Sequence, residues 1–450
     1  MVEVEEHLVK GGTFLNASPD FGYLPGFGNT HSTLAEDGAL PIGRYSPQRP
    51  PLGLYAEQLS GTAFTAPRAD NKRSWLYRIL PSVKHGRGFE KIDTGKVRTS
   101  PCRESTLPAM QLRWQPLEIP AGEEIDFLSG LSTITTCGDA GVQAGIATHY
   151  YVANQSMDRK FFINADGELL FVPQENAIRL DTEFGVLVVH PGQIAVVPRG
   201  VRFRVVLVDG PVRGYVAENY GMSLTLPERG PIGANCLANA RDFLYPAAAY
   251  EDREEECELI MKSAGRFYRT VLDHSPLDVV AWHGNYAPYK YDLQRFAAVG
   301  SVSFDHPDPS IYTVLTAPSD TPGTANMDFV IFPERWMVME DSFRPPWYHM
   351  NVMSEFMGLI YGQYDAKPEG FKPGAMSLHN ALVPHGPDAD AFERASDKAL
   401  APEKLSGTMA FMFETRFVQE PTEFACSLDG LDWQYPNEWD RLKRNFSKPK

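Results

Sequence analysis

Gly185-Val186-Leu187-Val188-Val189-His190-Pro191-Gly192-Gln193-Ile194-Ala195-Val196-Val197-Pro198 contains two short apolar runs separated by a His-Pro-Gly turn. β-Branched residues dominate both runs, and Gly and Pro bound them, which is the pattern of neighbouring β-strands. Gly167 to Pro173 has the same character, and short runs of this kind extend from Gly145 to Glu218. We therefore predict a β-sandwich or barrel in this part of the chain.

The composition of the 450-residue chain agrees with many short strands, because 37 Gly and 36 Pro supply frequent turns. A hydrophobic content of 43% is enough for a large core, and the length favours two domains over one. We expect a mainly β fold with irregular N-terminal segments and a few short helices. The predicted domains are residues 1–294 and 295–450.

Other elements follow from local patterns. Acidic residues cluster early and basic residues late between Tyr250 and Thr270, which predicts a helix because this order matches the helix macrodipole. Further strands are expected at Val299–Phe304, Ile311–Ala317 and Asp328–Pro333.

Charge and cysteine content exclude several classes of partner. Lys and Arg number 42 against 57 Asp and Glu, and a net charge of −15 disfavours binding to nucleic acid. No leader peptide and no apolar stretch of roughly 18 residues is evident, so we expect a cytoplasmic protein without a membrane partner. Five widely spaced cysteines fit neither a disulfide framework nor a thiolate zinc site.

The informative polar motif lies in the last third of the chain. His349, Asn351, Glu355 and Gly362 have the spacing of the first cupin motif, with Asn351 in place of its second histidine. Gly374 and His385 lie eleven residues apart, as in the second cupin motif. Alternate side chains of a small β-barrel point inward, so we expect His349, Glu355 and His385 to share a metal. Two imidazoles and one carboxylate are typical of non-haem Fe(II), and the asparagine leaves a further position open.

The same spacing occurs in the first half without its ligand. Gly192, Pro198 and Gly200 match the second motif, but Phe203 stands at the ligand position. We therefore expect a metal-free, cupin-like N-terminal domain that serves as a scaffold, in which His149 and His190 are structural.

Several long segments closely resemble the homogentisate 1,2-dioxygenase family, from about residue 20 to about residue 415. They are Gly53–Thr65, Asn71–Ser82, Gly300–His306, Arg344–Gly358 and Pro384–Asp390. The resemblance implies an Fe(2+) enzyme of tyrosine and phenylalanine breakdown that uses O₂ to open the ring of homogentisate, giving 4-maleylacetoacetate. It also implies a homohexamer built from two trimers.

The resemblance assigns roles to individual residues. It implies that His349, Glu355 and His385 bind the iron, that His306 is the catalytic acid/base, and that Tyr364 binds substrate. A neutral histidine is suited to take a proton from a ring hydroxyl near pH 7. His379 could bind the substrate's carboxylate or second hydroxyl, and Asn351 and His385 are also expected beside the substrate.

Two alternatives remain open from the residues. One is a related Fe(II) enzyme that cleaves another hydroquinone acid, such as gentisate. The other is a non-catalytic two-cupin protein that binds or stores metal. His306 and Tyr364 beside an open site favour an enzyme, because structural metal sites are normally closed.

Overall fold

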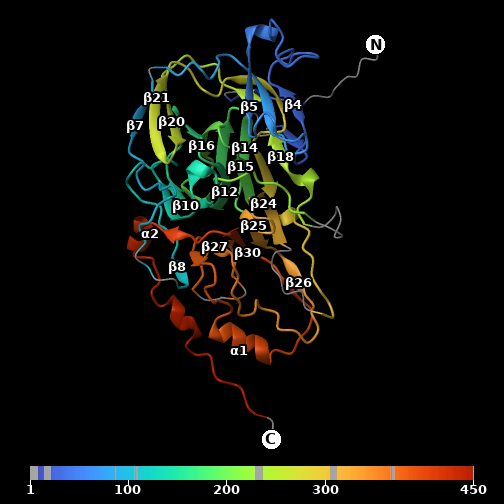
Figure 1. Ribbon diagram of the computed structural model, residues 1–450, viewed down its shortest axis with the longest axis vertical. Helices are drawn as coiled ribbons and strands as arrows, with labels where there is room; N and C mark the ends of the chain where they lie inside the picture. Colours follow the sequence, from blue (N-terminus) through green and yellow to red (C-terminus); the bar gives the residue numbers. More distant parts are fainter. Residues whose placement is uncertain are drawn as a thin grey trace.

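The computed structural model describes residues 9–14, 22–86, 88–105, 107, 110–228, 237–304, 312–364, 366 and 370–448. The mainly β fold predicted from the sequence is confirmed, since most of the elements are strands joined into sheets. The two α-helices of the described residues are α1 (Ala389–Asp397) and α2 (Glu423–Ser427). Figure 1 shows β4 (His31–Leu34) near the upper end of the molecule and α1 near its lower end. Within the described ranges, no helix is long and apolar enough to cross a membrane.

The first half of the chain is built on a nine-stranded antiparallel sheet. The predicted strands at Gly167–Pro173 and Gly192–Pro198 are confirmed as its members β12 and β15. In spatial order its strands are β3 (Tyr23–Pro25), β18 (Leu244–Pro246), β23 (Tyr289–Asp292), β15 (Gln193–Val197), β12 (Glu168–Glu175), β17 (Val212–Asn219), β10 (Ile146–Ala153), β9 (Leu131–Thr136) and β31 (Glu420–Pro421).

A seven-stranded sheet faces the nine-stranded one. In spatial order its strands are β14 (Gly185–Val189), β13 (Ile178–Thr182), β16 (Arg202–Leu207), β11 (Lys160–Asn164), β20 (Cys257–Ser263), β21 (Arg266–Leu272) and β7 (Glu90–Ile92). Aromatic rings fill the space between the sheets. Phe203 on β16 is fully buried, 5.9 Å from Phe171 on β12 and 5.8 Å from Phe162 on β11. Phe203, which stands where the second cupin motif has its metal ligand, therefore contributes to the apolar core of a β-sandwich.

The helix predicted at Tyr250–Thr270 is wrong, because this segment contains β20 and most of β21, paired as a hairpin. Ala264 and Gly265 form its turn, both with positive φ. Buried and half-buried residues alternate along much of both strands. Lys262 therefore points inward rather than standing at a helix end, and its charge gave a misleading helix signal.

Smaller sheets complete the first half, so its N-terminal segments are less irregular than predicted. One has the order β1 (Val9–Lys10), β4 (His31–Leu34), β22 (Val279–Gly284), β6 (Arg73–Arg78) and β5 (Tyr55–Ser60). A two-stranded pair joins β19 (Ala249–Tyr250) to β2 (Gly12–Thr13).

The last third of the chain forms a six-stranded antiparallel sheet. Its order is β24 (Thr313–Pro318), β25 (Ala325–Phe332), β30 (Met409–Thr415), β27 (Ser354–Tyr361), β28 (Met376–His379) and β8 (Leu112–Trp114), and a separate pair joins β26 (Arg335–Met337) to β29 (Glu403–Leu405). The strands predicted at Ile311–Ala317 and Asp328–Pro333 are confirmed within the described residues. The one predicted at Val299–Phe304 is wrong, since those residues form a bend with Phe304 exposed.

The two halves exchange strands. β8 belongs to the first half by sequence but lies at the edge of the six-stranded sheet, where Figure 1 shows it among the strands of the lower half. In return, β31 pairs with β9 of the nine-stranded sheet. Tyr215 and Phe411 join the two cores with ring centroids 4.9 Å apart. The predicted boundary at residues 294/295 stays a prediction.

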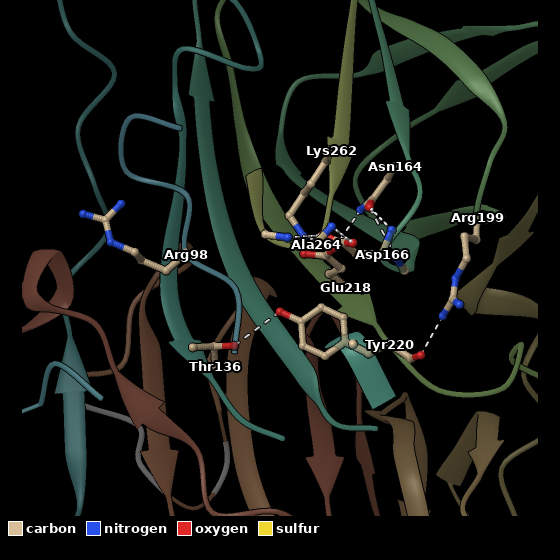
Figure 2. Close-up of polar contacts among 12 residues, drawn as sticks. Arg98, Thr136, Asn164, Asp166, Arg199, Glu218, Tyr220, Lys262 and Ala264 are labelled. Atoms are coloured by element: carbon tan, nitrogen blue, oxygen red, sulfur yellow. Dashed lines mark hydrogen bonds and ion pairs between the residues drawn. The ribbon is translucent and has the colours of Figure 1, made fainter. Parts of the chain in front are cut away.

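A polar cluster lies between the sheets of the first half (Figure 2). Lys262 and Asn164 both bind Glu218, and Lys262 also binds Asp166. His149 lies 3.1 Å from the second oxygen of Glu218 and 2.9 Å from Thr133. His149 is thus held within the structural core, as the sequence predicts.

Candidate metal centre

Three potential metal ligands converge at one end of the six-stranded sheet. Glu355 is the second residue of β27, His349 precedes that strand, and His385 follows β28. The two histidines pair through both backbone hydrogen bonds, of 2.9 and 3.1 Å, which fixes the distance between their side chains. The potential ligand atoms of the three residues all lie within 4.8 Å of one another. The structure thus brings the predicted triad together.

Backbone carbonyls orient both imidazole rings. Nδ1 of His349 lies 2.8 Å from the carbonyl oxygen of Trp347, and Nδ1 of His385 lies 2.9 Å from that of Val383. Each Nδ1 must donate a proton to its carbonyl, so each neutral ring presents the lone pair of Nε2 to Glu355. Two nitrogens and one carboxylate are a donor set that fits a divalent transition metal.

The side chain of Glu355 is fixed in position and negatively charged. Asn351 donates from Nδ2 to Oε1 of Glu355 at 2.5 Å, and its own Oδ1 accepts the backbone N–H of Met353. Burial alone would raise the pKa of this carboxyl, but the neighbouring His349 and His385 outweigh that effect and lower the pKa to about 2. The carboxylate is therefore ionised at neutral pH, as metal binding requires.

A cavity of about 500 Å³ adjoins the triad. Asn351, Tyr364 and His379, all predicted to bind substrate, line this cavity together with the three potential ligands. The ring of Tyr364 is buried and packs edge-on against Phe332 at 5.5 Å. The predicted acid/base, His306, lies outside the described residues.

The wall of the cavity combines aromatic surface with charged side chains. Phe332, Trp336 and Phe343 supply apolar and aromatic surface, and Arg335 and Arg344 supply positive charge. Nη1 of Arg335 donates to the carbonyl of Pro333 at 3.0 Å, and Nη2 of Arg344 donates to that of Met339 at 3.1 Å. These bonds hold both guanidinium groups at the cavity wall.

Sequence reasoning missed Arg335 and Arg344 at the cavity wall, and it missed two further residues near the site. Glu414 of β30 pairs with Glu355 across the sheet and lines the cavity, and the alternation of residues along β30 could have revealed its inward direction. Tyr435 shares a 2.9 Å hydrogen bond with Nε2 of His379. No local pattern indicates this contact, because 56 residues separate the two.

Comparisons with known proteins cover almost the whole chain. The family model described as "Homogentisate 1,2-dioxygenase N-terminal" matches residues 22–293, and "Homogentisate 1,2-dioxygenase C-terminal" matches residues 294–446. A homogentisate 1,2-dioxygenase of Rhodopseudomonas palustris strain TIE-1 is 63% identical over 425 residues, 94% of this chain and 95% of the relative. One from Bradyrhizobium diazoefficiens is 61% identical over 442 residues, 96% of this chain and 98% of the relative.

Proposed function

The chain belongs to the homogentisate 1,2-dioxygenase family, and on this premise we propose that it opens the aromatic ring of homogentisate with both atoms of O₂. The product is 4-maleylacetoacetate, an intermediate of tyrosine and phenylalanine breakdown. The convergence of His349, Glu355 and His385 beside a cavity that suits a small aromatic acid supports this reaction most directly.

The proposed cofactor is Fe(II), held by Nε2 of His349, Nε2 of His385 and the carboxylate of Glu355. The orientation of both rings and the ionised carboxylate support this ligand set. When bound, Fe(II) supplies open coordination positions for a chelating substrate and O₂. Asn351 restrains one oxygen of Glu355, which keeps the carboxylate turned toward the metal position.

The chain's other residues bind the substrate and move its protons. Tyr364 and His379 lie where a hydroxyl or carboxylate of the substrate can meet them. Arg335 and Arg344 attract the substrate's negative charge into the cavity. His306 takes the proton of the ring hydroxyl, a role that rests on the family resemblance and on the suitability of imidazole near pH 7.

The assembly and location of the protein are further parts of the proposal. We propose a cytoplasmic homohexamer, a dimer of trimers, whose partners are the aromatic acid and O₂. A boundary near residue 294 is supported by the two family models, which meet there.

The test is anaerobic reconstitution with Fe(II), followed by O₂ uptake with homogentisate. Consumption of one O₂ per substrate is expected, and ¹⁸O₂ should place two labelled atoms in the product. Glu355→Gln is the matched control, since it keeps the size of the side chain but removes the charge that binds iron. Faster turnover of gentisate than of homogentisate would identify the alternative substrate. Stable iron binding without turnover of any hydroquinone acid would indicate a storage protein.

A further inference from the structure

We propose that Tyr435 is a positioning residue of the metal centre, acting through His379 on the iron ligand His385; this inference rests on the proposed function of the site. The hydroxyl of Tyr435 lies 2.9 Å from Nε2 of His379. The ring of His379 in turn stacks on that of His385, with centroids 4.2 Å apart and only 6° between the planes. Tyr435 and His379 are 0% and 1% exposed.

The contacts of His385 explain why its neighbour matters. Its Nδ1 is held by the carbonyl of Val383 and its Nε2 lies 3.1 Å from Oε2 of Glu355, but neither contact covers a face of the ring. His379 covers one face of the ring, and His349 meets it edge-on at 4.2 Å and 61°. The ring of His385 is therefore confined on two sides. Its direction toward the metal depends on His379 staying in place.

Tyr435 is itself firmly anchored. The guanidinium of Arg113, from β8, lies 4.4 Å from the centre of its ring, and this arginine is only 5% exposed. Arg113 forms ion pairs with Asp432 and Glu438, which lie on either side of Tyr435 in the sequence. The segment 432–439 is thus fixed to a strand contributed by the first half of the chain.

The same segment also contacts the loop that follows His385. Nε1 of Trp439 donates to the carbonyl oxygen of Pro387 at 3.0 Å. Segment 432–439 therefore supports His385 in two ways, through the stacked ring of His379 and through the backbone just beyond the ligand. Tyr435 does not belong to the described residues that line the cavity, so it acts on the site without touching substrate.

The test uses the iron-loaded enzyme and the variant Tyr435→Phe, which removes one hydroxyl and keeps the ring beside Arg113. Release of Fe(II) to an excess of chelator should accelerate about 10-fold, the lower end of the effect of removing a supporting partner of a metal ligand. The visible absorption of the Co(II)-substituted protein should shift without substrate present. In the activity assay, kcat should fall more than KM rises.

Tyr77→Phe is the matched control. Tyr77 lies on β6 of the first half and is also buried, at 2% exposure. Its hydroxyl donates one 3.0 Å hydrogen bond to the backbone carbonyl of Tyr45. This variant should release iron at the wild-type rate and keep the wild-type Co(II) spectrum. Equal effects of the two variants would overturn the proposal, because they would reflect a general loss of stability.

A second variant keeps the proposal falsifiable if Tyr435→Phe folds poorly. His379→Gln should accelerate iron release by itself, and the double variant should show no further increase, since both residues act through one contact. The proposal would be overturned if the double variant accelerated iron release by the product of the two single effects. A wild-type release rate in His379→Gln would also overturn it. Iron release and the Co(II) spectrum need no substrate. Failure to turn over homogentisate would therefore contradict the proposed function. It would not change the iron-release and Co(II) results, which test the role of Tyr435 separately.

Discussion

Lys262 and Glu218 form a 2.6 Å ion pair inside the first half of the chain, with side chains 2% and 1% exposed (Figure 2). Lys262 lies on β20 and Glu218 on β17, so the pair joins the two facing sheets. Burial alone would raise the pKa of Glu218, but Lys262 and His149 outweigh this effect and lower the pKa to about 2. The carboxylate of Glu218 is therefore ionised in the interior of the sandwich.

Lys262→Met should destabilise the protein by roughly 3–5 kcal/mol, because it leaves Glu218 and Asp166 buried without their cation. Denaturant unfolding at pH 7 measures this loss. The control is Lys443→Met, which breaks a pair with Glu393 whose side chains are 72% and 64% exposed. That change should cost at most about 0.5 kcal/mol. A similar loss in both variants would show that the buried pair has no special importance.

Glu168→Gln should flatten the pH dependence of stability. Burial raises the pKa of Glu168 to about 7 from 4.5, despite hydrogen bonds from Asn219 and Leu224 that lower it. The folded state then holds the proton more tightly than the unfolded state. Stability should fall as pH rises from about 4.5 to about 7 and level off above, a loss on the order of 1–3 kcal/mol.

Unfolding free energies at pH 5, 6, 7 and 8 test this expectation. In the glutamine variant, Oε1 still accepts the two hydrogen bonds of Asn219 and Leu224, so its stability should change little over the same interval. An unchanged slope between pH 5 and 7 would assign the pH dependence to other groups.

An element can be predicted from the sequence where its structure depends on a few neighbouring residues. Gly185–Pro198 predicts its strands correctly because turn residues and β-branched runs act over a few positions. The metal triad was placed by spacing within two motifs. The helix at Tyr250–Thr270 failed because the positive φ of Ala264 and Gly265, and the ion pair of Lys262 with Glu218, depend on tertiary packing. Tyr435 was missed for the same reason.

Phe203→Ala should lower stability by roughly 3–5 kcal/mol, because its ring is fully buried among Phe162, Phe171 and Phe127. Iron per folded chain should stay at one. Thermal unfolding and metal analysis of the soluble fraction measure the two quantities separately. Two irons per wild-type chain, or iron loss in folded Phe203→Ala protein, would contradict a scaffolding role for the first half.

His349→Ala, Glu355→Ala and His385→Ala should each abolish stable iron binding and leave the fold largely intact. The ligands lie beside an open cavity, whereas the core that holds the sheets together is apolar. Metal analysis after gel filtration and circular dichroism provide the measurements. Wild-type iron content and activity in one of these variants would remove that residue from the triad.

His306→Asn should keep its iron and lose turnover by roughly 10² to 10⁴, the usual effect of removing a general acid/base. Asparagine retains a polar side chain but cannot take a proton near pH 7. His190→Asn is the control, since this exposed histidine follows β14 in the first half and should not affect activity. Iron content and turnover are measured on the same samples. If His306→Asn stays within a few-fold of wild type, proton transfer belongs to another group, and Tyr364 at the cavity wall is the next candidate.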